Sequence, residues 1–145
     1  MSAYLSGAYL SGVWDVLHAG HIALLDRASR WSGTIVVGVL KDSEANERPG
    51  KKPLQDEQTR LAAVRALPMV SHAFLYHTYH TEEHGQFSPE IAATHQQFRF
   101  DLLIHGSDFI PTEYMGMDLP ILLLPYTKGI SSTLIRERIL EGAAT

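Results

Sequence analysis

Residues 3–21 read AYLSGAYLSGVWDVLHAGH, a stretch that contains the phrase AYLSG twice before two closely spaced histidines. The apolar residues of the second copy are typical of a short buried strand, and helical spacing begins near His21. A strand that passes through a glycine-containing turn into a helix is the opening unit of a parallel α/β domain. The start of such a helix offers free backbone N–H groups and the positive end of a dipole, so the stretch also predicts an anion site.

The two copies of AYLSG cannot both lead directly into the histidines. Only the second copy, residues 8–12, is followed at once by the segment that carries His18 and His21. We therefore expect residues 8–12 to form the first strand. Residues 1–7 are predicted to be a dispensable N-terminal overhang, and residues 8–145 are predicted to form the domain.

The rest of the chain alternates strand-like and helical segments. Short apolar runs predict strands buried on both faces at residues 8–10, 34–40, 73–76, 102–105 and 121–124. Ser88 before Pro89 predicts a helix that runs toward Gln97, and another helix is expected after Ser131. Residues 41–56 and 106–118 are rich in proline and glycine and are predicted to be loops. The order predicts a single Rossmann-like α/β domain with a parallel five-stranded sheet and helices on both faces.

Composition excludes several classes of function. The 145 residues include no cysteine, which rules out disulfides, a thiolate nucleophile and a cysteine-based zinc site. The net charge of −4 disfavours broad nucleic-acid binding but allows a local basic pocket for a small anion. The N-terminus does not resemble a signal peptide, and no apolar run reaches membrane-spanning length. We expect a cytoplasmic protein that binds neither nucleic acid nor membrane.

The histidine pair is the first candidate site. Imidazoles on the last bend before the helix and on its first turn can both face one phosphate-sized pocket, and each can donate a hydrogen bond to a phosphate oxygen. Gly20 between them allows backbone to pass close to a ligand. Two surface histidines beside a turn are the simpler alternative, and no third ligand adjoins them to make a metal site.

A second candidate site lies at the other end of the chain, where residues 128–136 read KGISSTLIR. Hydroxyl groups at a helix N-terminus with Arg136 one turn further on suit a second anion site. An ordinary helix cap by Ser131 or Ser132 is the alternative. Two such motifs at opposite ends of a short chain arise by chance less often than either alone.

Residues 12–21 and 129–133 resemble the two signatures of the cytidylyltransferase-like nucleotidyltransferases. The resemblance implies that His18 and His21 stabilise the transition state at the α-phosphorus, and that Ser132, Thr133 and Arg136 hold the β- and γ-phosphates. It further implies catalytic lysines in the loop after the second strand, Lys51 and Lys52, with Arg60 bordering the nucleotide. The implied nucleotide-binding set is Gly12, Val13, Trp14, Asp15, Gly20, Arg60, Gly106, Asp108, Thr127, Gly129, Ile130, Ser131, Ser132, Thr133 and Arg136.

Three of these assignments have plain alternatives. Lys51 and Lys52 can close over a triphosphate, but they also fit a solvated basic loop. The sequence His105-Gly106-Ser107-Asp108 resembles a loop of ethanolamine-phosphate cytidylyltransferases, whereas Asp108 also fits an ordinary turn. A further cluster, His77, His80 and His84, has no counterpart in the family and is expected to be a variable loop beside the acceptor pocket or simply a set of surface histidines.

The resemblance implies transfer of CMP from CTP to a small phosphorylated or phosphonate acceptor, with release of pyrophosphate. It implies magnesium bound mainly by phosphates and water, no protein metal site, and a homodimer. Residues 126–128 read YTK where the family has arginine, threonine and an acid or amide. An adenylyltransferase that uses ATP on a phosphorylated cofactor precursor or sugar is therefore an alternative, and a nucleotide-binding module without catalysis is a third hypothesis.

Overall fold

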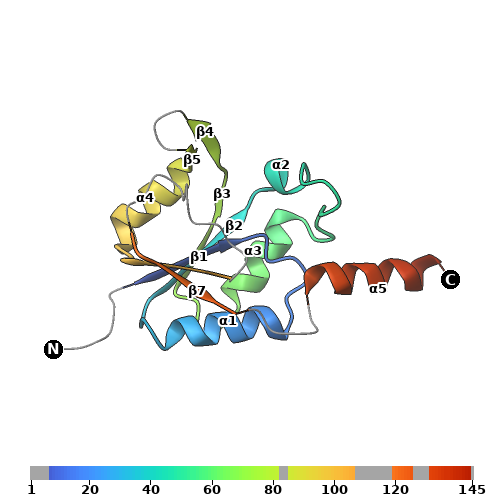
Figure 1. Ribbon diagram of the computed structural model, residues 1–145, viewed down its shortest axis with the longest axis horizontal. Coiled ribbons are helices and arrows are strands. Elements are labelled where there is room, and N and C mark those ends of the chain that lie inside the picture. The colour runs from blue at the N-terminus through green and yellow to red at the C-terminus, as the bar shows by residue number, and fades with distance from the viewer. Residues whose placement is uncertain (1–6, 82–84, 107–118, 126–130, 145) are drawn as a thin grey trace.

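Five parallel strands form one sheet in the computed structural model, which describes residues 7–81, 85–106, 119–125 and 131–144 (Figure 1). The strands are β1 (Ala8–Gly12), β2 (Ile35–Leu40), β3 (His72–Tyr76), β6 (Leu102–Gly106) and β7 (Ile121–Leu124), in the order β3-β2-β1-β6-β7. From β1 the chain adds β2 and then β3 on one side, and it later returns to add β6 and β7 on the other side of β1. Ligands of such sheets bind at this reversal, beyond the carboxyl ends of the strands. The predicted fold class is confirmed.

Helices cover both faces of the sheet because alternate residues of each strand point to opposite sides. On one face, α1 (Ala19–Ser29) and α3 (Glu57–Arg65) pack against a core that includes Leu10. On the other, α4 (Pro89–Phe98) packs through Ile91 against a second core that includes Tyr9. Ser88 caps α4 as predicted, with its hydroxyl oxygen accepting from the N–H of Ile91 at 3.3 Å.

The first strand is the second copy of AYLSG, as predicted. Ala8 pairs with Ile35 on one side and with Leu102 on the other. Residues 1–6 lie outside the described residues, but Gly7 does not behave as an overhang. It is buried, its N–H donates to Asp101 Oδ1 at 3.3 Å, and its carbonyl accepts from the Asp101 N–H at 2.9 Å. Gly7 is therefore packed against Asp101, just before β6, although the strand itself begins at Ala8.

Two predicted loops contain regular structure. The loop after β2 holds the short helix α2 (Asp42–Ala45). The backbone N–H of Asp42 donates to the Glu57 side chain at 2.8 Å, and the N–H of Glu57 donates to the Asp42 side chain at 3.0 Å. The histidine-rich segment contains β4 (Tyr79–Thr81), which pairs antiparallel with β5 (Gly85–Phe87) in a separate two-stranded sheet. Tyrosine and threonine favour strands, and this local preference prevails over the polar composition.

The last helix, α5 (Ser132–Ala144), begins where predicted. The Ser131 hydroxyl oxygen accepts from the N–H of Leu134 at 3.1 Å, so Ser131 is the capping residue. Figure 1 shows α5 extending away from the sheet, with its first turn nearest to the domain. Within the described ranges, no helix combines the length and apolar character needed to cross a bilayer.

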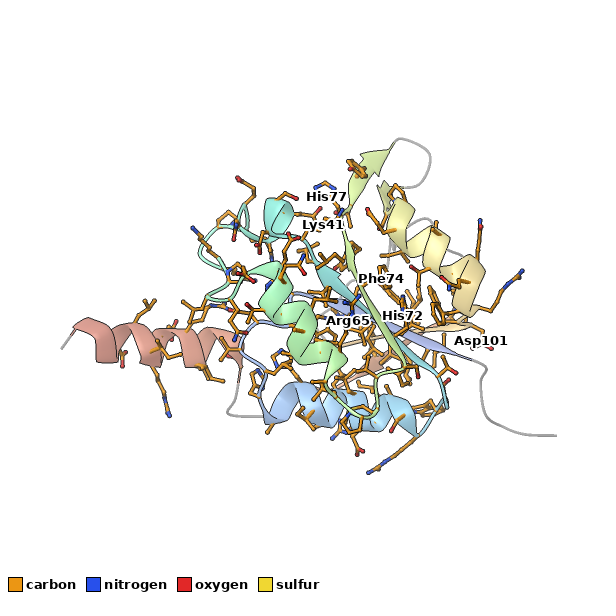
Figure 2. The ribbon with its side chains drawn as sticks, turned by 180° about the vertical axis from the view of Figure 1, so that it is seen from behind. Lys41, Arg65, His72, Phe74, His77 and Asp101 are labelled. Atoms are coloured by element: carbon orange, nitrogen blue, oxygen red, sulfur yellow. The ribbon has the colours of Figure 1, made fainter. Side chains whose placement is uncertain are left out.

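The outer edge of β3 is covered by a side chain of α3. Arg65 Nε and Nη2 both donate to the carbonyl oxygen of Ala73, at 3.2 and 3.0 Å. Figure 2 shows Arg65 beside the strand that carries His72 and Phe74. Because the open edge of a sheet presents unpaired backbone groups, this contact protects the edge, and it does so far from the strand ends where ligands bind.

Candidate active site

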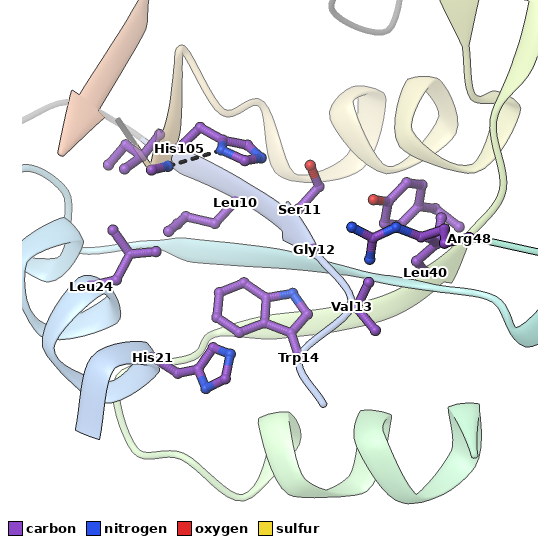
Figure 3. A pocket seen from close by; sticks show the side chains of 13 residues that line it. Leu10, Ser11, Gly12, Val13, Trp14, His21, Leu24, Leu40, Arg48 and His105 are labelled. Carbon is purple, nitrogen blue, oxygen red and sulfur yellow. Dashed lines mark hydrogen bonds between the residues drawn. The ribbon is translucent and has the colours of Figure 1, made fainter. Parts of the chain in front are cut away.

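A pocket of about 300 Å³ opens at the carboxyl ends of β1, β2, β3 and β6 (Figure 3). This is the position expected from the reversal of strand order between β1 and β6. The lining combines residues of the strand ends, the β1–α1 loop, α1 and the segment after α2: Leu10, Ser11, Gly12, Val13, Trp14, His21, Leu24, Leu40, Arg48, Tyr76, Ile104, His105 and Gly106. Gly12, Val13, Trp14, His21 and Gly106 were predicted from the sequence, so the structure brings these five together.

The loop between β1 and α1 is held in an unusual backbone conformation. Trp14 has φ +59° and Val16 has φ +48°, the left-handed region that a β-branched residue such as valine rarely adopts. Two side-chain contacts fix the loop: Trp14 Nε1 donates to the Gly38 carbonyl oxygen at 3.0 Å, and the Val16 N–H donates to Gln55 Oε1 at 3.0 Å. Strain of this kind is retained where the surrounding structure enforces it, and it is common at functional sites.

The two histidines form a reciprocal cap at the start of α1. His18 Nδ1 accepts from the N–H of Gly20 at 3.0 Å, and His21 Nδ1 accepts from the N–H of His18 at 3.2 Å. A nitrogen that accepts from a backbone N–H carries no proton of its own, so each neutral ring has its proton on Nε2. The ring centroids lie 3.9 Å apart. Helix capping therefore gives two adjacent Nε2–H donors at the predicted anion site.

The electrostatic environment keeps both rings neutral. Burial is the largest cause lowering the pKa of His21 to about 4; nearby His18 lowers it further, and Asp15 opposes the shift. Burial also lowers the pKa of His18. At neutral pH the pair donates hydrogen bonds without carrying charge, which suits an anion that must also be released.

Asp15 connects the first motif to the last one. Its side chain is 1% exposed and accepts from the N–H groups of Leu54 and Gln55, each at 3.0 Å. Arg136 Nη1, on α5, donates to Asp15 Oδ2 at 3.1 Å. The two sequence signatures are thus brought together by an ion pair. Asp15 itself is enclosed, so any influence it has on a nucleotide passes through Arg136 and the loop it anchors.

Arg60 lies inside the protein, whereas the sequence predicted that it borders the nucleotide. Its side chain is fully buried. Nε donates to the Gln55 carbonyl at 3.0 Å, Nη1 to the carbonyls of Val13 and Leu40 at 2.7 and 2.8 Å, and Nη2 to Asp42 Oδ1 at 2.6 Å. A direct contact with a nucleotide is incompatible with this placement, because every nitrogen already donates inward. Arg60 instead holds the wall of the pocket, since Val13 and Leu40 both line it.

The remaining predicted residues are placed as follows. Lys51 and Lys52 are exposed on the loop between α2 and α3 and do not line the pocket. Gly20 is in the first turn of α1, and only the backbone of Ser132 and Thr133 is described, at the start of α5. Asp108, Thr127, Gly129 and Ile130 lie outside the described residues.

The predicted histidine cluster is only partly described. His84 lies outside the described residues, and His77 Nε2 is 3.8 Å from Glu44 Oε1. Across the described ranges, no three or more histidine, cysteine, aspartate or glutamate side chains gather in a way that could hold a metal ion.

Sequence reasoning missed three polar residues of the pocket: Ser11, Arg48 and Tyr76. Each lies at a strand end or in the loop that follows one, which is the signal that could have found them. Burial raises the pKa of Tyr76 well above its usual value, and its hydroxyl is hydrogen-bonded to that of Ser11. Tyr76 therefore stays protonated.

Comparison with known proteins agrees with this geometry. The cytidylyltransferase-like family matches residues 9–138. The chain is 30% identical over 92% of its length to the bifunctional protein HldE of Trichlorobacter lovleyi, and 33% identical over 91% of its length to HldE of Streptomyces coelicolor. It covers 26% and 28% of those two proteins, so it spans about a quarter of the length of these relatives.

Solved structures show the same architecture. A lipopolysaccharide core biosynthesis protein from Thermoplasma volcanium superposes with a TM-score of 0.66 at 28% identity, over 86% of this chain and 99% of that one. Pantothenate synthetase from Thermus thermophilus superposes with a TM-score of 0.54 at 15% identity, over 93% of this chain and 62% of that one, which shows a shared fold alone. With the family signature matched over most of its length, the chain belongs to the cytidylyltransferase-like family of nucleotidyltransferases.

Proposed function

We propose that the chain transfers a nucleotidyl group from a nucleoside triphosphate, with ATP as the favoured donor, to the phosphate of a small sugar-type acceptor. Family membership supports the reaction class. Relatives that carry the name HldE favour the adenylyl alternative over cytidylyl transfer from CTP. The relative named for lipopolysaccharide core biosynthesis supports a sugar-type acceptor rather than an amino alcohol or a nucleotide.

The observation that carries this proposal is the pair of neutral imidazoles whose Nδ1 atoms are both occupied by backbone N–H groups. In the proposed reaction an acceptor phosphate oxygen bonds to the α-phosphorus while the bond from that phosphorus to the bridging oxygen breaks, and pyrophosphate leaves. Negative charge accumulates on the α-phosphate oxygens as this happens. Donors already fixed in position stabilise that charge without reorganising, and one such donor is worth about 100- to 1,000-fold in turnover.

The other predicted residues fit supporting roles in this proposal. Lys51 and Lys52 are exposed on a loop and can approach the triphosphate when it binds. The start of α5 lies next to the first motif through the Arg136–Asp15 ion pair, so its free N–H groups can meet the β- and γ-phosphates.

Asp15, the acidic residue of the first motif, already accepts bonds from Leu54, Gln55 and Arg136. We propose that Mg²⁺ arrives with the triphosphate, held by phosphate oxygens and water, where it neutralises phosphate charge.

Association of two copies is also a proposal, for which size-exclusion chromatography with light scattering is the test.

The test is pyrophosphate release with ATP or CTP across phosphorylated sugars, polyols, amino alcohols and phosphonates. Two variants keep the helix cap while removing an imidazole: His18→Asn, because asparagine caps helices well, and His21→Gln, because glutamine is favoured at the third helical position of a capping box. Each should lose about 100-fold or more in turnover with an unchanged melting temperature. His72→Asn, at the opposite end of the sheet, is the matched control and should keep full activity.

Three results would refute or redirect the proposal. If both single variants, His18→Asn and His21→Gln, kept wild-type turnover, the histidine mechanism would be excluded. Preferred turnover of CTP over ATP would return the assignment to cytidylyl transfer. Nucleotide binding in a thermal-shift assay without pyrophosphate release for any acceptor would favour the non-catalytic binding module.

A further inference from the structure

The pocket has two chemically different ends. The sheet order places Leu40 and Tyr76, at the ends of β2 and β3, on one side of β1, and His105 and Gly106, at the end of β6, on the other. Figure 3 shows Arg48 and His21 on opposite sides of Trp14. The proposed reaction uses the end with His21 and assigns no role to the end with Arg48.

Arg48 is a half-buried cation that faces this pocket and has no counter-ion among the described residues. Among the described residues, no hydrogen bond or ion pair of its guanidinium is found. The neighbouring acid, Glu44, accepts from the N–H and the hydroxyl of Thr78 and lies near His77. Of the described lining residues, Arg48 is the only lysine or arginine, and none is an aspartate or glutamate. The planar guanidinium fork matches the geometry of a phosphate or carboxylate.

Two hydroxyl groups lie beside this guanidinium. Tyr76 and Ser11 line the same pocket and are hydrogen-bonded to each other, and Arg48 is close enough to act electrostatically on the Tyr76 hydroxyl. Because Tyr76 remains protonated, the pair adds neutral polar groups next to the positive charge. The pocket volume of about 300 Å³ is at the lower end of the range for small-molecule sites, which suits one small ligand.

We propose that Arg48 and the Ser11–Tyr76 hydroxyl pair bind the anionic group of the acceptor. This inference rests on the proposed function and deepens it.

The first test needs no catalysis. Phenylglyoxal modifies accessible arginines, and peptide mass spectrometry reports the rate at Arg48 and at Arg30, an exposed residue paired with Asp26. Inorganic phosphate and glucose 1-phosphate should slow modification of Arg48, glucose should not, and Arg30 should react equally in every sample. Equal rates at Arg48 with and without the two phosphates would overturn the proposal.

The second test separates the acceptor from the nucleotide. Arg48→Met should raise the KM for the acceptor by about 10- to 100-fold, the loss expected for charge-assisted hydrogen bonds, with little change in the KM for ATP. Arg48→Lys should recover only part of the loss, because an ammonium cannot bind in a bidentate manner. Arg30→Met removes the same charge and should match the wild type.

The outcomes distinguish this inference from the proposed function. A rise in the KM for ATP in place of that for the acceptor, or equal behaviour of Arg48→Met and Arg30→Met, would refute the assignment of Arg48. Protection of Arg48 by phosphate in a protein that releases no pyrophosphate with any acceptor would support the anion site and refute the proposed reaction.

Discussion

Replacing Arg60 with methionine should lower the free energy of unfolding more than replacing any other arginine in the described part of the protein. The side chain is fully buried and donates four hydrogen bonds, to three backbone carbonyls and to Asp42. Methionine fills part of the space but supplies no donor. The carbonyls of Gln55, Val13 and Leu40 and the Asp42 carboxylate would then lose their partner together.

The size of the effect follows from those unpaired groups. Each buried acceptor left without a donor costs about 1–3 kcal/mol, and removing one partner of a buried ion pair costs about 3–5 kcal/mol in total. Water can reach Asp42, which is 27% exposed, so the carboxylate recovers part of its hydration. We therefore expect a loss of about 3–5 kcal/mol, which is a large share of the 5–15 kcal/mol that holds a typical domain folded.

Urea unfolding followed by tryptophan fluorescence measures this loss, and Arg65→Met is the matched control. Arg65 is on the same helix and also donates to a strand carbonyl, that of Ala73, but it is exposed. The control should lose about 1 kcal/mol or less. A loss below 1 kcal/mol for Arg60→Met, or equal losses for both variants, would refute the buried-strut role. A normal stability combined with a raised KM for ATP would restore the nucleotide contact predicted from the sequence.

Three further predictions test other parts of the structure. Folding lowers the pKa of His21 from 6.5 to about 4, so the neutral ring contributes to the free energy of unfolding fully above pH 6.5, and this contribution, up to about 3 kcal/mol, is lost as the pH falls toward 4. The melting temperature of His21→Gln should therefore depend less on pH in this range than that of the wild type. Equal slopes for the two proteins would contradict the pKa shift. Gly38→Ala brings a methyl group to 2.1 Å from the Tyr9 hydroxyl oxygen and should lower the free energy of unfolding by about 1–3 kcal/mol. Adding Tyr9→Phe removes that oxygen and should recover part of the loss. If the double variant lost the sum of the two single losses, the contact would be contradicted. Deleting residues 2–6 keeps Gly7 and should preserve the melting temperature. Deleting residues 3–7 joins Ser2 to Ala8, so a serine takes the place of Gly7; its Cβ would lie 2.9 Å from Phe100 Cα, and the melting temperature should fall. Equal melting temperatures for the two deletions would show that Gly7 is dispensable.

The sequence predicts most of the sheet because its strands are short apolar runs between clear helical patterns. The strand at Ile121–Leu124 has the predicted ends, and β2 differs from its prediction only by Thr34. The short helix α2 could not be predicted, because the reciprocal contacts of Asp42 and Glu57 that support it join residues 15 positions apart. Such support depends on the tertiary fold and leaves no local pattern.

The site was predictable where it is local and not where it is assembled from distant segments. His18 and His21 are neighbours on one turn, so their spacing alone predicts an anion site. Arg60 was misplaced because a basic residue near a phosphate-binding loop has the same sequence pattern whether its guanidinium faces in or out. Arg48 and Tyr76 went unnoticed because only the strand order brings them to Gly12.

The identity of β1 with the five residues before it has a consequence for how the strand finds its place. Pairing with β2 and β6 cannot distinguish two identical strands, since both offer the same side chains to the same neighbours. The flanking residues differ: the segment after the second copy carries the indole that donates to the Gly38 carbonyl, whereas the segment after the first copy has alanine and tyrosine. The alignment of the central strand is therefore decided by residues outside the strand, Gly7 before it and Trp14 after it, so the loop that builds the pocket helps to select which copy of the repeat enters the sheet.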